Sequence, residues 1–193
     1  MLLSDYQILE LCSSEPPLIS PFVAQQVKTR VDAKGRTQPI VSYGLSSYGY
    51  DVRLADQFKI FTNVRNAVID PLHPNDECFV EHEGDHCIIP PNSYVLGFTM
   101  ERFCLPRDLL GLCVGKSTYS RLACELNVTP IEPEFEGQVV VEIANGSTLP
   151  LKIYSGQGIA QFLFLRGEKP CEVSYRDRGG KYQGQSGLTL ARV

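Results

Sequence analysis

The sequence predicts a mainly β fold, a sandwich or barrel that begins with a short helix and ends in a glycine-rich segment. From residue 51 to residue 166, short runs rich in Val, Ile, Leu and Phe recur between Pro, Gly and Asn, and several place an apolar residue at every second position, as half-buried strands do. Nothing in this stretch suggests the alternation of strands and helices that α/β folds require. About eight strands at such spacing indicate a sandwich or a barrel.

The two ends of the chain differ in character from its middle. Ser4, followed three residues later by Gln7, has the pattern of a capping box, and apolar residues between 8 and 12 supply one face of a short helix. We expect residues 20–50 to be loop-like, because prolines and glycines recur there. The chain is therefore expected to form one domain, 1–193, with an N-terminal helical segment over 1–20 and a C-terminal segment over 174–193.

Length, charge and cysteine usage restrict the class of protein. A chain of 193 residues with 43% hydrophobic residues can build one domain with a substantial core. A net charge of −4 argues against a protein that coats nucleic acid, since phosphate neutralisation needs a cationic surface. With no run of about 18 apolar residues and no secretory leader, we expect a cytoplasmic protein without a membrane segment. The seven scattered cysteines are expected to be free thiols, because the cytoplasm is reducing.

A phosphate-binding turn is predicted by the heptapeptide GKSTYSR, residues 115–121. A glycine turn that opens a short helix directs backbone N–H groups at an anion, and Lys116, Ser117 and Arg121 would add donors and positive charge. The motif is not a P-loop, because that motif requires glycine where this chain has Leu110. The same residues are equally compatible with a capped surface helix.

An unusual acidic residue lies within the apolar strand QVVVEIAN, residues 138–145. Alternation along the strand puts Val140 and Glu142 on one face and Val139, Val141 and Ile143 on the other. Apolar surroundings raise the pKa of a carboxyl group, which suits it to proton transfer near neutral pH. A solvent-facing glutamate on an antiparallel sheet is the alternative.

The C-terminal segment combines glycines with cations and aromatic rings, including Tyr175, Arg176, Arg178, Lys181 and Gln185. Glycines allow close backbone approach, cations attract phosphates and a ring can cover a base or a sugar. These features predict a lid that closes over a ligand. A disordered polar terminus would have a similar composition.

The sequence offers no catalytic zinc site of the nucleobase deaminase type. Those enzymes carry H-x-E followed by P-C-x-x-C, whereas the histidines here lie at 73, 82 and 86 outside that pattern, and Pro170-Cys171 lacks the second cysteine. Cys78, His82, His86 and Cys87 could gather a structural metal, but ordinary loop residues are the favoured interpretation.

Several spaced blocks in the same order resemble the dCTP deaminase family, which is related in fold to the trimeric dUTP pyrophosphatases. The resemblance implies a distorted β-barrel or jelly roll with a C-terminal lid, and it is closest to the branch with a compact VTP-x-EP segment. The blocks are SSYGYDVRL (46–54), ERFCLPRDLLG (101–111), GKSTYSR (115–121), NVTPIEPEFEGQVVVEIAN (127–145), GQGIAQFLF (156–164) and SYRDRGGKYQGQSG (174–187).

The resemblance also implies roles for individual residues. Glu142 matches the general base that activates the water attacking C4 of cytosine, while Ser117 and Arg121 match residues at the reaction centre. Glu132 stands where relatives often have an aspartate that contacts the deoxyribose 3′-hydroxyl, and Phe135 is expected to pack against the sugar and to disfavour a 2′-hydroxyl. The further substrate-binding positions implied are Lys116, Thr118, Tyr119, Ser120, Val140, Val141, Gln161, Tyr175, Lys181 and Gln185.

The resemblance implies hydrolysis of dCTP to dUTP and ammonia without zinc, with Mg2+ bound to the substrate triphosphate. It also implies a homotrimer whose active sites lie between subunits, with no nucleic acid or membrane as partner. Two other functions stay open: a dUTP pyrophosphatase or bifunctional deaminase, and a non-catalytic deoxynucleotide sensor on the same fold. Glu142 in VVVEIAN favours deamination, whereas a P-loop kinase is disfavoured by the glycine spacing.

Overall fold

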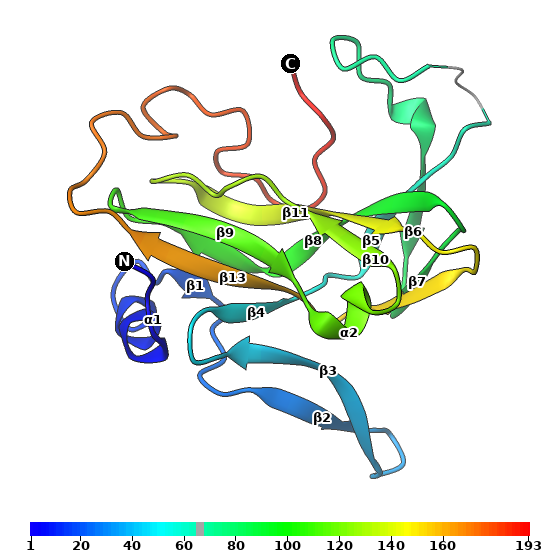
Figure 1. Cartoon of the computed structure of the whole chain (residues 1–193), viewed down its shortest axis with the longest axis horizontal. Helices are drawn as coiled ribbons and strands as arrows, with labels where there is room; N and C mark the ends of the chain where they lie inside the picture. Colours follow the sequence, from blue (N-terminus) through cyan, green and yellow to red (C-terminus); the bar gives the residue numbers. More distant parts are fainter. Residues whose placement is uncertain (65–67) are drawn as a thin grey trace.

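The computed structural model of the chain describes residues 1–64 and 68–193 (Figure 1). It opens with helix α1 (Asp5–Cys12), and the Ser4 backbone N–H donates a hydrogen bond to the side chain of Gln7 at 3.1 Å. The predicted helix and its capping box are thus confirmed. Within the described residues, no helix is long and apolar enough to cross a membrane.

The larger sheet has six antiparallel strands, in the order β10-β11-β8-β5-β6, with β1 paired to β8. Its long strands β8 and β11 pair along most of their length and carry much of the candidate site described below. A short 3-10 helix, η1 (Asp76–Cys78), precedes β6. The strands are β1 (Ile19–Ser20), β5 (Gln57–Phe61), β6 (Phe79–Glu83), β8 (Ser93–Cys104), β10 (Cys124–Asn127) and β11 (Glu136–Asn145).

A five-stranded sheet, in the order β2-β3-β4-β13-β9, faces the larger one, and β7 pairs with β12 in a separate two-stranded ribbon. A short helix, α2 (Ser117–Ser120), follows β9 directly. The strands are β2 (Val27–Val31), β3 (Thr37–Leu45), β4 (Tyr50–Arg53), β7 (His86–Ile89), β9 (Leu109–Gly115), β12 (Leu151–Tyr154) and β13 (Gly158–Arg166).

The core lies between these sheets and is filled by alternate residues of their strands. Phe103 of β8 packs against Phe162 and Phe164 of β13, with ring centroids 5.0 and 6.3 Å apart. Val141 and Ile143 of β11 are fully buried in the same core. This mainly β architecture confirms the predicted fold class, and among the described strands the sheets stay open, which corresponds to the jelly-roll form rather than to a closed barrel.

The prediction of a loop-like region over 20–50 was wrong. Strands β2 and β3 form a projecting hairpin there (Figure 1), with Arg30 opposite Gln38 and Val31 opposite Thr37. Gly35, at φ +75°, lies in the turn between them and was mistaken for a sign of continuous loop. Most residues of β2 are exposed, so the strand lacks the apolar alternation that would have revealed it.

Candidate active site

A large cleft of about 1150 Å³ opens over the outer face of β11 and β8. Its walls come from those strands, from the loop that leads into β11, from the C-terminal segment and from residues near 68–79. Many of the residues predicted to bind substrate line it, although they are distant in sequence. They are Glu132, Phe135, Val140, Glu142, Tyr175, Lys181 and Gln185.

Glu142 lies in the wall of this cleft, on the face of β11 that the strand alternation predicted. Val139, Val141 and Ile143 are buried in the core, whereas Val140 and Glu142 are half-buried and face the cleft. Desolvation by burial raises the pKa of Glu142 above its ordinary value, as predicted. Such a carboxyl group can accept a proton and return it near neutral pH.

An aromatic wall next to Glu142 was not predicted. Tyr94 of β8 stacks on Phe61 of β5, with ring centroids 4.9 Å apart, and meets the ring of Phe79 edge-on at 5.9 Å. Leu96 is the residue opposite Glu142, so Tyr94 lies diagonally across the strand pair from the carboxyl group. No sequence pattern marked this wall, because aromatic residues in strands are equally common in cores.

The C-terminal segment is folded over the cleft. The Tyr175 backbone N–H donates to the carbonyl of Pro133 at 3.0 Å, and the Tyr175 ring meets Phe135 edge-on at 5.9 Å. Further along, Gln185 runs parallel to β11: the Gln138 N–H donates to its carbonyl at 2.9 Å, and its side chain donates to the Gln138 carbonyl at 2.8 Å. These contacts favour the lid interpretation over a disordered terminus.

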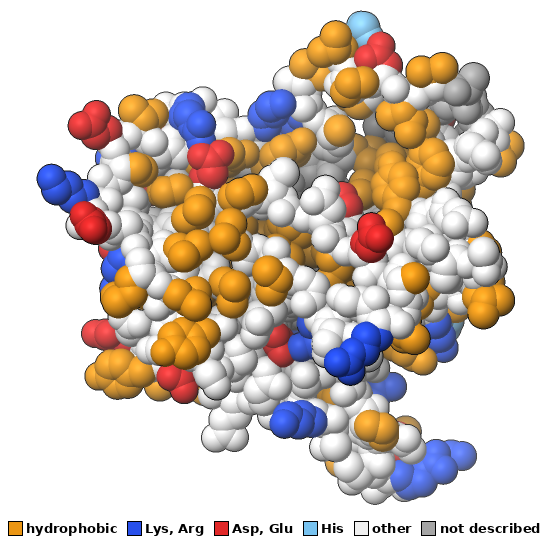
Figure 2. All heavy atoms as spheres, viewed as in Figure 1, with side chains coloured by type: hydrophobic (Ala, Val, Ile, Leu, Met, Phe, Trp, Pro, Cys, Tyr) orange, Lys and Arg blue, Asp and Glu red, His pale blue; other side chains and the backbone are white. Residues whose placement is uncertain are grey.

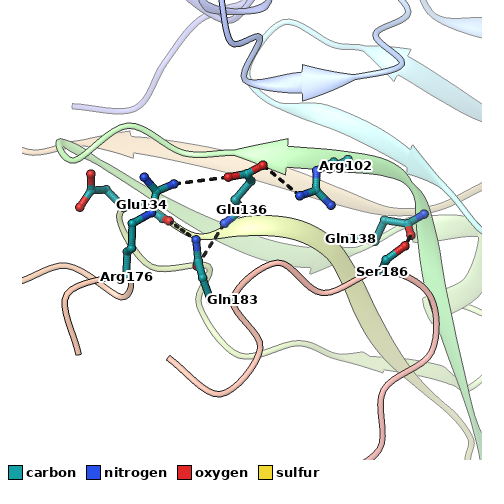
Figure 3. A network of polar contacts seen from close by, with 7 residues as sticks. All are labelled: Arg102, Glu134, Glu136, Gln138, Arg176, Gln183 and Ser186. Atoms are coloured by element: carbon teal, nitrogen blue, oxygen red, sulfur yellow. Dashed lines mark hydrogen bonds and ion pairs between the residues drawn. The ribbon is translucent and has the colours of Figure 1, made fainter. Parts of the chain in front are cut away.

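A polar network fastens this segment to the beginning of β11 (Figure 3). Glu136 forms ion pairs with Arg102 at 2.9 Å and with Arg176 at 3.4 Å, while the Gln183 side chain donates to the carbonyl of Glu134 at 3.1 Å. Glycine is required where the two segments meet, because a Cβ on Gly137 would lie 2.8 Å from the Gln185 carbonyl oxygen. The C-terminal segment is therefore held on β11 by close backbone packing as well as by side chains.

Arg178 of the C-terminal segment forms an ion pair with Glu132, which lies before β11. The Arg178 guanidinium also lies over the Tyr175 ring, 5.9 Å from its centroid. Lys181 donates a hydrogen bond to the carbonyl of Arg192 at 3.0 Å. The sequence pointed to Arg178 only as one of several cations, and nothing in the pattern indicated its pairing with Glu132. The chain thus supplies its own counter-ion to the carboxylate expected to contact the sugar.

The second half of the predicted site, the α2 loop of residues 116–121, lies outside this cleft. As predicted, a glycine turn after β9 opens a short helix, with Lys116 at the N-cap and Ser117, Thr118, Ser120 and Arg121 exposed. Tyr119 is the exception, since its ring is buried and its hydroxyl has no hydrogen-bond partner within the described residues. The Tyr119 side chain therefore faces the core rather than a ligand.

Lys116 is held by a residue that was not predicted to belong to the site. Its ammonium group forms an ion pair with Asp51 of β4, and the Gln26 side chain donates to the same carboxylate at 2.8 Å. Both partners are shielded, with side-chain exposures of 11% for Lys116 and 5% for Asp51. Nearby on β13, Gln161 donates to the Ser46 hydroxyl at 2.8 Å. The signal in the sequence that could have identified Asp51 as part of the site was the block SSYGYDVRL, which contains it.

The histidines considered as ligands of a structural metal make other contacts in the structure. His82 contacts the carbonyl of His86 through Nε2 at 2.8 Å, and His86 pairs with Asp85. Cys12, Cys87, Cys104, Cys113, Cys124 and Cys171 are free thiols, and across residues 1–64 and 68–193 no three His, Cys, Asp or Glu side chains are grouped to hold a metal ion.

Comparison with known proteins identifies the family of the chain. The family model described as dCTP deaminase-like matches residues 3–167. A dCTP deaminase of Azotobacter vinelandii is 53% identical over 179 residues, 93% of each chain, and one of Bordetella petrii is 54% identical over 181 residues, 94% of each chain. A crystal structure of the 2′-deoxycytidine 5′-triphosphate deaminase of Agrobacterium tumefaciens matches in fold, with a TM-score of 0.58 at 18% identity over 86% of this chain; the match spans about half of that longer chain, 48%. The chain belongs to the dCTP deaminase-like family.

Proposed function

We propose that this chain converts dCTP and water into dUTP and ammonia, in the cytoplasm. The observation that carries the proposal is Glu142, a half-buried carboxyl group with a raised pKa in the wall of a lidded cleft, in a chain that is 53% identical to a dCTP deaminase. A solvent-exposed glutamate would lack this environment.

In the proposed reaction, Glu142 accepts a proton from water while the water oxygen bonds to C4 of cytosine. The tetrahedral carbon then expels its amino group, and the carboxyl group returns the proton to the leaving nitrogen. The second water proton passes from the C4 hydroxyl to N3, so that ammonia departs and a C4 carbonyl with an N3–H remains. The backbone at Val140 and Val141 would run beside the base, Glu132 would meet the 3′-hydroxyl and Phe135 would pack against the sugar. The lid and the aromatic wall would exclude bulk water, which strengthens electrostatic interactions within the cleft.

The active form is proposed to be a homotrimer in which the α2 loop of one subunit completes the cleft of another. In a single chain Ser117 and Arg121 are exposed and do not line the cleft over β11. Residues assigned to one reaction centre can meet only if a second copy supplies them. Lys116, Ser117 and Thr118 would then bind phosphate together with Gln161, Tyr175, Lys181 and Gln185.

Magnesium is proposed to accompany the substrate, bound through the triphosphate and water. The described carboxylates are not grouped as a protein cage for a metal, which suits an ion that keeps several waters and is held by phosphates. When bound, it would neutralise phosphate charge. Zinc should be dispensable, so a zinc-selective chelator at saturating magnesium should leave turnover intact; activity that is lost and restored only by zinc would overturn the mechanism.

The direct test is incubation of the protein with dCTP and magnesium, followed by separation of dUTP, dUMP, ammonia and pyrophosphate. Ammonia and dUTP should form at the same rate, because the compact VTPIEP segment differs from the longer one of bifunctional relatives. Pyrophosphate forming as fast as ammonia would indicate the bifunctional alternative. Nucleotide binding without any product would indicate a sensor.

Shared sites can be tested with two inactive variants, Glu142→Gln and Ser117→Ala. Mixing them under conditions that exchange subunits should restore about a quarter of the sites, because that fraction combines an intact Glu142 from one chain with an intact Ser117 from the next. Mixtures without activity, in confirmed mixed oligomers, would show that each chain builds its own site.

A further inference from the structure

A compact turn of the C-terminal segment, residues 175–180, brings a guanidinium group to the cleft over β11. The Gly180 N–H donates to the Tyr175 carbonyl at 2.9 Å, and a Cβ on Gly180 would lie only 2.2 Å from a carbon of the Tyr175 ring. The Tyr175 hydroxyl in turn accepts a hydrogen bond from the Tyr182 N–H at 2.9 Å. Figure 2 shows basic and acidic side chains interspersed along the upper edge of the molecule, where this segment runs in Figure 1. The position of Arg178 is therefore set by the fold of the segment itself.

Arg178 and Glu132 belong to different segments and meet in the wall of the cleft. The guanidinium forms its ion pair with the Oε2 oxygen of Glu132. The two side chains are 50% and 39% exposed, so the pair lies where a ligand in the cleft can reach it. Ion pairs with this much exposure contribute little to folding stability. The main consequence of the pair is therefore the orientation of the carboxylate.

Glu132 needs such a partner because its side chain is longer than the aspartate that the resemblance implies at this position. The Phe135 N–H donates to the Glu132 carbonyl at 3.1 Å, which fixes the backbone of this turn. A glutamate nevertheless has an additional rotatable bond and loses more rotamer freedom when its carboxylate is fixed. The planar guanidinium holds Oε2, and the second carboxylate oxygen can accept a hydrogen bond from a hydroxyl group.

We propose that Arg178 is a positioning residue that orients Glu132 toward the 3′-hydroxyl of the deoxyribose. It would thereby set the preference for a nucleotide that carries this hydroxyl over a 2′,3′-dideoxynucleotide. The inference rests on the proposed function, which places the sugar at Glu132. A ligand without the hydroxyl never forms the hydrogen bond, so the loss of an oriented acceptor weakens only the ligand that has it.

The test measures calorimetric binding of dCTP and of 2′,3′-dideoxycytidine triphosphate, each with magnesium, to the full chain in its native oligomer. Arg178→Gln should lower the ratio of the two affinities about fivefold, through weaker binding of dCTP. Arg178→Lys keeps the charge without the planar fork and should lower the ratio less.

Arg107→Gln is the matched control. Arg107 anchors the same C-terminal segment, because it forms ion pairs with Asp177 and, at 3.1 Å, with Glu134. Its loss should weaken both nucleotides alike and leave the ratio within about twofold. An equal fall of the ratio in Arg107→Gln and Arg178→Gln would overturn the proposal, since general loosening of the segment would explain both.

A double variant tests whether Arg178 acts through Glu132. In a Glu132→Ala background, Arg178→Gln should cause no further change in the ratio, because the carboxylate that Arg178 orients is absent. A further fall of the same size would overturn the positioning role, since Arg178 would then act independently of Glu132.

The remaining outcomes separate this inference from the proposed function. Equal weakening of both nucleotides by Arg178→Gln, with an unchanged ratio, would overturn the inference and assign Arg178 to phosphate binding. Equal binding of both nucleotides to the unmodified chain would refute the contact between Glu132 and the 3′-hydroxyl, and the inference with it. Binding needs no turnover, so a chain that fails to deaminate dCTP yet loses the preference in Arg178→Gln refutes the proposed function and not the role of Arg178.

Discussion

The cleft over β11 and the α2 loop carry two parts of one predicted site, yet a single chain builds them to very different degrees. In the cleft, Glu142 is half-buried, its pKa is raised, and the C-terminal segment lines the same cleft and is hydrogen-bonded to β11. In the α2 loop, Ser117 and Arg121 are exposed, and only Lys116 is held firmly, by Asp51.

The difference separates the residue proposed for proton transfer from the residues proposed for phosphate binding. Proton transfer needs a desolvated group in a fixed environment, which one chain can provide through strand alternation and packing. In the proposed trimer, phosphate recognition would rely on donors that reach into the cleft of a neighbouring subunit, and such donors are exposed in a single chain.

The largest effect is expected for Glu142→Gln, which keeps the side chain's size and removes its ability to accept and return a proton. Turnover should fall about 10²–10⁴-fold, toward the upper end because one group serves both proton transfers. Calorimetric binding of dCTP with magnesium should change far less. Glu125→Gln, on the neighbouring strand β10 and exposed, is the matched control. A Glu142→Gln enzyme that keeps more than about a tenth of wild-type turnover would refute the general-base role.

A smaller effect is expected from removing the lid, residues 174–193. The segment covers the cleft but leaves the two sheets intact, so the truncated chain should fold and assemble. KM for dCTP should rise and kcat should fall, with kcat/KM lower by about 10²-fold, because water is no longer excluded and phosphate ligands are lost. Steady-state kinetics measure the changes in KM and kcat, and sedimentation measures whether the truncated chain still assembles. Unchanged kinetics would show that the segment is not a lid.

Phe135→Ala should affect selectivity more than rate. The ring lines the cleft against Tyr175, where it is proposed to leave no room for a 2′-hydroxyl. Preference for dCTP over CTP, measured as the ratio of kcat/KM values, should fall about tenfold. A preference that survives the substitution would assign sugar discrimination to another residue.

The smallest effects concern pH. Because burial raises the pKa of Glu142 and the base must be ionised, kcat/KM should decline on acidification at a higher pH than an ordinary glutamate would cause. The same raised pKa means that ionised Glu142 costs folding stability above the ordinary glutamate pKa. Glu142→Gln should therefore raise Tm modestly at neutral pH, and the gain should disappear once acid protonates the carboxyl group in both states. A gain that persists in acid would point to a packing effect instead.

Strand periodicity predicted much of the cleft. The alternation in QVVVEIAN placed Glu142 and its buried neighbours on the correct faces, because a period of two follows from backbone geometry alone. The turn at Gly115 that opens a short helix was also predicted correctly. Ion pairs between distant segments were not predicted, because a pattern in a single sequence carries no information about which charges meet. Examples are Arg178 with Glu132 and Lys116 with Asp51.

The β2–β3 hairpin, in contrast, shows where prediction from the sequence failed. Its strands are exposed and rich in charge, so the hydrophobic signal that identifies a half-buried strand is weak there. Turn residues such as Gly35 were visible, but they mark a hairpin only when the flanking runs are recognised as strands. The region with the weakest sequence signal therefore proved to contain a regularly paired hairpin.

In the ion pair between Lys116 and Asp51, a carboxylate already occupies the ammonium group that is proposed to bind phosphate. A phosphate that approaches Lys116 must displace, or share the ammonium with, a carboxylate that Gln26 already steadies at 2.8 Å. A chain of phosphates would bring more negative charge to the same point than chloride or a lone monoester, and would compete better with the carboxylate. If the α2 loop binds phosphate as proposed, Asp51 would therefore favour ligands of high charge density over weak anions.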